Sequence, residues 1–404
     1  MTVDTMRRID KWIGIPLTAI LSLLCWLIDL LRFKNNIPDT TKTLFIELSE
    51  MGSAIIVDPA LRKLKRETGA QLYFAIFKKN AISLSLLKTV PEENIFKMDA
   101  DNLKSFILDT FRFIGWCRKK RITTVVDLEL FSRFTAILSF FSGAAWRIGF
   151  SNFHDEGLYR GSLINGQVRY NPHVHISVNF ISLINKSLSL FHLPYATTPV
   201  LQNELQLAKA EILDLDVQAV RTKITQLYPD LKSEKLVLFN VNASDMLPQR
   251  RWQQEKFITV AQQLLDEFSD ILIIATGSAD EKDYVEKVVA GVANKRCVNS
   301  SGVFAFSELA PLYSISALML TNDSGPAHFA SVTSLKVFVL FGPETPNLYL
   351  PLGGNAEAIY LGLPCSPCVS AANHRETTCV ERPCITGISP IVVFEKLRNY
   401  LLEN

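Results

Sequence analysis

Polar residues that can bind an anionic ligand recur at the ends of apolar runs in the second half of the chain. The runs end in Asn-Ala-Ser (242–244), Thr-Gly-Ser-Ala-Asp-Glu (276–281), Asn-Asp-Ser-Gly (322–325) and Phe-Gly-Pro-Glu (341–344). The runs have strand length and alternate with helical patterns, which is typical of βα units. Because the carboxyl ends of parallel strands lie at one edge of a sheet, we expect these four segments to meet in one binding site.

The segment around Gly325 has the chemistry that a leaving diphosphate requires. A glycine lets the backbone approach a phosphate closely, the Ser324 hydroxyl is a further donor, and the start of the following helix favours anions. A structural interpretation is also open, in which Asp323 is a helix cap and His328 a packing residue.

The first half of the chain repeats the alternation of strands and helices. Strands are predicted at 44–48, 71–77, 123–130 and 146–150, and helices at 54–66 and 133–141. A length of 404 residues exceeds one ordinary core. We therefore predict an α/β protein with an N-terminal segment (1–42), an N-terminal domain (43–202) and a C-terminal domain (203–404).

The composition limits the partners. Hydrophobic residues make up 48% and charged residues 20%, which argues against a protein with many membrane spans. A net charge of +2 gives no global attraction to nucleic acid, so no such partner is expected. The N-terminal apolar run lacks the cleavage pattern of a signal peptide, which places the body of the protein in the cytoplasm.

That apolar run, Trp12 to Leu31, is long enough to cross a hydrocarbon core of about 30 Å. Pro16 and Asp29 interrupt it, and basic residues flank both ends, so the charges give no clear orientation. We predict a membrane-anchoring helix and leave open whether it spans the bilayer or lies in its interface. The structural alternative is a core helix packed on the body.

The stretch from Leu320 to Pro346, LTNDSGPAHFASVTSLKVFVLFGPETP, closely resembles the signature of glycosyltransferase family 9, the bacterial ADP-heptose:lipopolysaccharide heptosyltransferases. Further blocks resemble the family in the same order, at 45–65, 125–150, 249–264 and 276–288. The resemblance implies the GT-B architecture, in which two Rossmann-like domains face each other across a cleft and the C-terminal one binds most of the donor. It also implies that no cofactor is required for catalysis.

The resemblance assigns roles to the second half of the chain. It implies that Asp323 holds sugar hydroxyls, that His328 lies near the donor, that Arg250 faces the donor phosphates, and that Glu281 contacts the ribose. With Asn242, Ser324 and Gly325 these residues form the predicted donor site. As alternatives, Arg250 is a solvated surface charge and Glu281 a carboxylate in the first turn of a helix.

The sequence departs from the family at the turn after the first strand. The family has an Asp after the glycine as catalytic base, but here Ser53 follows Gly52. A serine cannot replace that carboxylate, so we predict Glu50 as the base, together with Asp323 as the second catalytic residue. Asp58 is worse placed, a turn into the helix.

Four of the seven cysteines have the spacing Cx2Cx10Cx4C. Tetrahedral thiolate sites use such spacings, so Cys365, Cys368, Cys379 and Cys384 are predicted ligands of a structural zinc or iron, with His374 as a substitute ligand. The resemblance points the same way, because a related subgroup carries a metal-binding cysteine cluster. The alternative is four reduced cysteines without metal.

These features predict a membrane-associated inverting glycosyltransferase at the cytoplasmic side of a bacterial inner membrane. It would transfer a heptose or similar sugar from a nucleotide donor, ADP-heptose by resemblance, to the lipopolysaccharide core or another lipid-linked glycan. The missing Asp supports an alternative, a nucleotide-sugar-binding scaffold in envelope glycan assembly. A GT-B-like nucleotide-sugar epimerase is a third hypothesis, but such an enzyme would not need an anchor.

Overall fold

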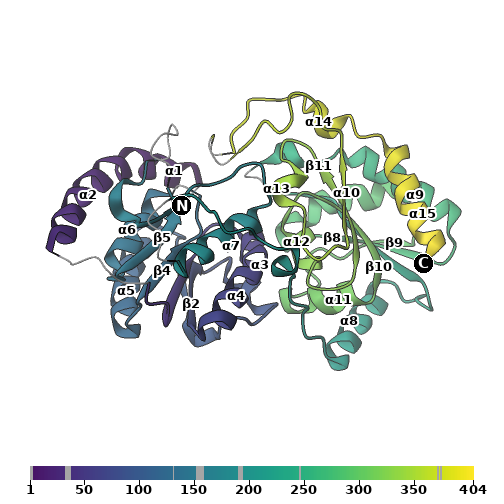
Figure 1. Cartoon of the computed structure of the whole chain (residues 1–404). Helices are drawn as coiled ribbons and strands as arrows, with labels where there is room; N and C mark the ends of the chain where they lie inside the picture. The colour runs from purple at the N-terminus through teal and green to yellow at the C-terminus, as the bar shows by residue number, and fades with distance from the viewer. Residues whose placement is uncertain are drawn as a thin grey trace. The chain divides into compact units, whose positions relative to one another are not determined.

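The computed structural model describes residues 3–31, 38–130, 132–151, 159–189, 194–244, 247–370, 373 and 375–404. It consists of two compact units, Met1–Gln206 and Leu207–Asn404. Each unit is built on one β-sheet with helices on its faces (Figure 1).

The sheet of the N-terminal unit has six parallel strands in the order β3-β2-β1-β4-β5-β6. Its central strands are almost entirely buried, which fits their uninterrupted apolar sequences and a sheet covered on both faces. The strands are β1 Lys42–Ile46, β2 Gln71–Phe77, β3 Ile95–Met98, β4 Thr124–Asp127, β5 Trp146–Phe150 and β6 Gly166–Val168.

The sheet of the C-terminal unit is also parallel and has the order β12-β11-β10-β7-β8-β9, which is the same doubly wound topology. The strands are β7 Lys235–Asn240, β8 Ile271–Thr276, β9 Cys297–Asn299, β10 Ser316–Asn322, β11 Lys336–Phe341 and β12 Ala356–Tyr360. Two parallel Rossmann-like sheets confirm the predicted α/β, GT-B-like fold.

The order of strands reverses once in each sheet, between β1 and β4 and between β7 and β10. At such a reversal the connections on the two sides run in opposite directions, which leaves a crevice at the carboxyl ends of the two strands. These two crevices, the N-terminal and the C-terminal switch point, are where a ligand is expected.

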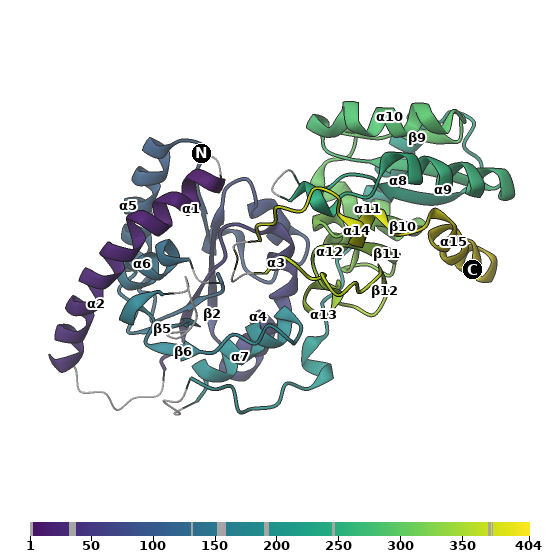
Figure 2. The ribbon, with the colours of Figure 1, turned by 90° about the horizontal axis from the view of Figure 1, so that it is seen from above.

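Helices cover both faces of each sheet (Figure 2). In the N-terminal unit α5 and α6 pack on one face through a core that includes Phe113 and Leu138, and α4 and α7 lie on the other. In the C-terminal unit α9, α10 and α15 share one core with the sheet. The helices are α3 Met51–Ile56, α4 Asp58–Thr68, α5 Leu103–Lys120, α6 Arg133–Phe141, α7 Ile176–Ser187, α8 Asp214–Leu227, α9 Gln254–Glu267, α10 Lys282–Val292, α11 Leu309–Ser314, α12 Gly325–Ala330, α13 Pro346–Tyr349, α14 Pro383–Thr386 and α15 Pro390–Glu403.

The single helix predicted at 54–66 is wrong, because the structure has two helices, α3 and α4, that meet at Val57. Pro59 has no N–H to donate to the carbonyl of Ile55, so one helical ladder cannot run through this point. Pro59 instead occupies the first turn of α4, where no such bond is needed.

The N-terminal apolar segment forms α1 (Val3–Trp12) and α2 (Gly14–Leu31). Pro16 lies in the first turn of α2, where it does not break the helix. Within the described residues, none of the helices has both the length and the apolar content that crossing a bilayer requires. Membrane anchoring by this segment therefore stays a prediction.

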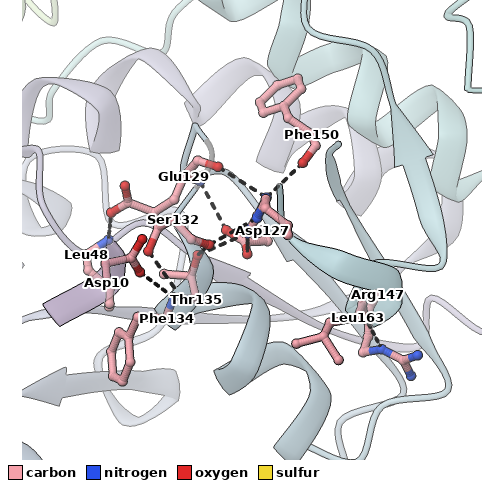
Figure 3. A network of polar contacts seen from close by, with 11 residues as sticks. Asp10, Leu48, Asp127, Glu129, Ser132, Phe134, Thr135, Arg147, Phe150 and Leu163 are labelled. Atoms are coloured by element: carbon pink, nitrogen blue, oxygen red, sulfur yellow. Dashed lines mark hydrogen bonds and ion pairs between the residues drawn. The ribbon is translucent and has the colours of Figure 1, made fainter. Parts of the chain in front are cut away.

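A buried ion pair ties the carboxyl end of β4 to its surroundings. The guanidinium of Arg160 pairs with the carboxylate of Asp127, and both side chains are fully buried. Arg160 also donates to the carbonyls of Ser132 (3.0 Å) and Phe150 (2.9 Å) and to the Thr135 hydroxyl (3.1 Å). The network thus joins β4, β5 and α6 (Figure 3).

We expect Arg160→Met to lower the free energy of unfolding by about 3–5 kcal/mol, because it leaves the Asp127 charge buried without a partner. Urea unfolding of the variant measures this loss. The exposed pair Lys295–Asp230 provides the control, and Lys295→Met should change nothing measurable. The double variant with Arg160→Met and Asp127→Leu should be more stable than Arg160→Met alone, because it removes the unpaired charge. Equal stability of the two would show that the unpaired Asp127 charge is not the cause of the loss.

Candidate active site

At the N-terminal switch point, the loop after β1 carries Glu50. Glu50 is the residue before α3, and the hydroxyl of Ser53 donates a hydrogen bond to its Oε2 atom (3.0 Å). Ser53, which stands where the resemblance implies an Asp, is therefore in direct contact with a carboxylate. The role of Glu50 as the base stays a prediction.

Glu129, two residues beyond β4, holds this loop in place. Its Oε1 atom accepts hydrogen bonds from the backbone N–H groups of Leu48 (2.9 Å) and Ser49 (3.0 Å) and from the Ser49 hydroxyl (3.0 Å). Figure 3 shows the Glu129 side chain reaching Leu48. Asn80 fixes the same loop by donating to the carbonyls of residues 48 and 49.

The Glu129 carboxyl holds its proton unusually strongly. Burial, and then the negative charges of Glu50 and Asp127, raise the pKa of Glu129 to about 7. The charge of Glu50 thus acts on a second carboxyl group at the N-terminal switch point. Glu129 was not predicted from the sequence; its place after a strand that pairs with β1 is the signal that points to it.

The structure also explains why Asp58 is a poor base. Its side chain is buried at the start of α4 and accepts a hydrogen bond from the Thr89 hydroxyl.

At the C-terminal switch point, Arg250 and Asp323 form an ion pair. The Nη1 atom of Arg250 lies 3.6 Å from Oδ2 of Asp323, and both side chains are largely buried. Arg250 ends the short 3-10 helix Pro248–Arg250, and Asp323 follows β10. Two predicted donor-site residues from distant parts of the sequence are thus brought together, with their charges neutralising each other.

A second pair lies on the other side of β7. The Asn242 amide donates to Oε1 of Glu281 (2.7 Å), and Oε2 of Glu281 accepts the backbone N–H of Ser278 (2.7 Å). Glu281 therefore caps the turn after β8 and also faces the loop after β7. Both interpretations of Glu281, as a cap and as a ribose ligand, fit this position.

Asn322 is a structural residue of this site that the sequence analysis did not single out. Its side chain is fully buried and accepts the backbone N–H of Trp252 (2.9 Å). Its amide donates to the carbonyls of Val241 and Asn242 (3.2 Å each). Asn322 thus ties the end of β10 to the loop after β7, where Asn242 lies, and to the segment that carries Arg250.

The remaining predicted donor residues surround the start of α12. The Ser324 hydroxyl donates to the Asn322 carbonyl (3.1 Å), and His328 is buried on α12. A Cβ atom on Gly325 would lie 3.1 Å from the Phe329 ring, so glycine also permits local packing. Because α12 has only six residues, its dipole contributes less to anion binding than the sequence suggested.

Neighbouring residues distinguish the two arginines of the Gln-Arg-Arg-Trp block. Arg251 donates through Nε and Nη2 to the Ala243 carbonyl (2.9 and 2.6 Å) and stacks on the Tyr284 ring, which is a structural role. The Nε atom of Arg250 has no hydrogen-bond partner among the described residues. Unlike Arg251, Arg250 thus keeps a side-chain nitrogen that is not committed to a backbone carbonyl, and its role in donor binding stays a prediction.

The four clustered cysteines are reduced, and their exposure ranges from the exposed Cys365 to the buried Cys384. Burial, and then the nearby thiol of Cys368, raise the pKa of Cys384, with Cys365 and Cys379 acting in the same direction. The other three thiols are thus close enough to Cys384 to act on it. Within the described part of the chain no group of three or more ligating side chains is arranged to hold a metal, and His374 lies outside that part.

A family model decides the classification, because the model of glycosyltransferase family 9 (heptosyltransferase) matches residues 119–378, more than half of the chain. The chain belongs to glycosyltransferase family 9. The match includes Glu129 and all of the predicted donor residues at both sides of the C-terminal switch point.

Other family 9 proteins are similar over shorter stretches. The chain is 29% identical to lipooligosaccharide heptosyltransferase 2 of Campylobacter jejuni serotype O:2 over 159 residues, 38% of this chain and 47% of that protein. It is 26% identical to lipopolysaccharide heptosyltransferase 2 of Escherichia coli K12 over 134 residues, 32% of this chain and 38% of that protein. The chain therefore spans less than half the length of these relatives.

The fold has a close counterpart among solved structures. The E. coli ADP-heptose lipopolysaccharide heptosyltransferase II superposes with a TM-score of 0.68 and 20% identity, over 90% of this chain and 99% of that one. At this identity the likeness concerns the fold, and it agrees with the two doubly wound sheets.

We expect Glu129 to make the folded state less stable as the pH rises. Its pKa is raised in the folded state, so between about pH 4.5 and 7 only the folded protein keeps the proton, and stability falls by about 3 kcal/mol at most across this window. Glu129→Gln removes this dependence. Urea unfolding at pH 5 and pH 8 measures the difference, with Glu403→Gln at the exposed C-terminal end as control. If the free energy of unfolding changes equally with pH in the wild type and in Glu129→Gln, the pKa of Glu129 is not raised.

Proposed function

We propose that this chain is a glycosyltransferase that moves a heptose from ADP-heptose to a lipid-linked glycan, with inversion at the anomeric carbon. The observation that carries the proposal is the Arg250–Asp323 pair at the C-terminal switch point of a family 9 chain. A guanidinium matches a diphosphate, and a carboxylate accepts hydrogen bonds from sugar hydroxyls. The name of the E. coli structural neighbour supports ADP-heptose as donor.

In the proposed reaction each predicted residue has one role. Glu50 accepts the proton of the acceptor hydroxyl as its oxygen attacks the anomeric carbon. The bond from this carbon to the diphosphate breaks on the opposite face, and Arg250 stabilises the negative charge of the leaving ADP. Asp323 orients the sugar and Glu281 binds the ribose. Glu129 keeps the Glu50 loop in position through its three hydrogen bonds.

We also propose the lipopolysaccharide core as acceptor and the cytoplasmic side of a bacterial inner membrane as the place of the reaction. The curated relatives support this acceptor by their names. An enzyme held at the membrane by its N-terminal segment meets a lipid-linked acceptor at high local concentration. The scaffold hypothesis loses its main argument if Glu50 replaces the missing Asp.

A donor screen tests the proposed function. We expect ADP and ADP-heptose, but not GDP-, UDP- or dTDP-sugars, to raise the melting temperature, and ADP to be released only when a bacterial lipid extract is added. Arg250→Met should weaken ADP binding about tenfold to hundredfold, whereas Arg398→Met, on the far end of α15, should not. Binding without release under every acceptor would favour the scaffold, and no nucleotide binding would refute the donor site.

Glu50→Gln should lower the transfer rate about 10²- to 10⁴-fold with little change in ADP affinity, because only the base is lost. Ser53→Asp in the Glu50→Gln background returns a carboxylate to the family position and should restore part of the rate. Single-turnover assays with ADP-heptose measure both effects. Full activity of Glu50→Gln would show that another group is the base.

We further propose that the cysteine quartet binds a structural zinc or iron, on the strength of its spacing and of the nearness of the other three thiols to Cys384. Metal analysis of the purified protein should find about one ion per chain. Cys365→Ser with Cys368→Ser should lose the ion and lower the melting temperature, while Cys297→Ala, in the core, keeps it. A metal-free protein whose stability is insensitive to chelators would contradict this assignment.

A further inference from the structure

Helix α2 is packed on its unit through small and polar residues together with Leu21, which joins an apolar cluster with Leu163. Gly14, Thr18 and Cys25 are buried against the unit, and Ser22 accepts the backbone N–H of Ser162 through its hydroxyl (2.8 Å). Gly161 permits this approach, since a Cβ there would collide with the Ser22 hydroxyl. These contacts hold α2 along the surface of the N-terminal unit.

The start of the segment is fixed as well. Asp10 of α1 forms an ion pair with the buried Arg133 (3.1 Å) and accepts the backbone N–H of Phe134 at the start of α6 (2.8 Å). Figure 3 shows Asp10 beside Phe134. Helix α2 would have to leave these contacts to cross a bilayer. In its docked position it is instead able to lie along the surface of a membrane.

The outward side of α2 is apolar, which reverses the usual arrangement of a surface helix. Trp12 is 75% exposed and Ile20 66% exposed. The exposed apolar side chains are Trp12 at the end of α1, Ile13 between the helices, and Ile15, Leu17, Ile20, Leu23, Leu24, Trp26 and Leu27 of α2. Contiguous apolar surface of this kind marks a contact with lipid or protein.

Helix α5 carries a second exposed apolar side. Leu103, Ile107 and Phe111 recur at every fourth residue, Leu108 lies beside them, and Phe111 is 69% exposed. Helix α6 touches both α2 and α5, and the two ribbon views show the three helices next to one another (Figures 1 and 2).

The charges of α5 indicate what this surface meets. Its exposed charged side chains are all basic: Lys104, Arg112, Arg118 and Lys119. Its single acidic residue, Asp109, is buried and accepts the backbone N–H of Asp99. Basic residues beside exposed apolar ones are the pattern that binds anionic lipid, and Trp12 and Trp26 suit the depth of the headgroups.

We propose that the outward sides of α2 and α5 form one membrane-binding surface that lies on an anionic phospholipid bilayer, with α2 in the plane of the membrane. A second copy of the chain fits less well, because a symmetric dimer through this surface would bring like charges together. This inference rests on the proposed function in one respect: a lipid-linked acceptor is the reason for the enzyme to bind a membrane.

Binding of the full chain to vesicles tests the surface without any need for catalysis. We expect binding to vesicles of phosphatidylglycerol and phosphatidylethanolamine that weakens with salt, and much weaker binding to phosphatidylcholine. Leu23→Glu and Phe111→Glu should each lower the affinity about tenfold or more, while ADP binding stays unchanged. Leu215→Glu, an equally exposed leucine on α8 of the other unit, is the matched control.

Lipids brominated near the headgroup measure which residues enter the interface. In a Trp12→Phe, Trp26→Phe background, which keeps Trp116, Trp146 and Trp252, Phe111→Trp should add fluorescence that these lipids quench. Quenching no greater than in the same background without Phe111→Trp, or full binding by Phe111→Glu, would remove α5 from the surface. Absence of vesicle binding by the full chain would overturn the proposal, whether or not the chain forms dimers in lipid-free solution. If the same chain still binds ADP normally, the proposed function stands.

Discussion

The reversal of strand order at the centre of each sheet is the constraint on which the sites depend. Parallel strands buried on both faces offer no polar surface except at their ends, and only where connections diverge is there room for a ligand. Glu50 and Glu129 follow the two strands of the N-terminal reversal, and Asn242 and Asp323 follow those of the C-terminal one. The topology thus selects which of many polar residues are able to act together.

One buried network in the N-terminal unit supports both the loop that carries Glu50 and the docking of helix α2. Arg160 fixes Asp127 and the start of α6, and Glu129, two residues from Asp127, fixes the loop that carries Glu50. Residue 161, next to Arg160, is the glycine on which α2 rests. Burial stabilises this network and also raises the pKa of Glu129. The stability of the network and the proton affinity of Glu129 therefore have the same physical cause.

The fold was largely predictable because long apolar runs and helical periods are local signals; α6 and β5 have their predicted bounds. The break at Val57 was missed because the apolar period continues across Pro59. The predicted donor segments were located from the polar ends of apolar runs, and their role stays a prediction. Glu129 was missed because it lay within the strand predicted at 123–130, whereas β4 ends at Asp127. Arg250 was preferred to Arg251 on the resemblance alone. The physical difference between them is that Arg251 lies within hydrogen-bond distance of the Ala243 carbonyl, and the spacing of residues in the sequence does not reveal such a contact.

A crystal structure with a non-hydrolysable ADP-heptose analogue would show whether the C-terminal switch point binds the donor. We expect the diphosphate at Arg250, the ribose at Glu281 and sugar hydroxyls at Asp323, with the Arg250–Asp323 ion pair opened by the ligand. A nucleotide bound away from the ends of β7 and β10, or bound there with the Arg250–Asp323 pair intact and untouched, would contradict it.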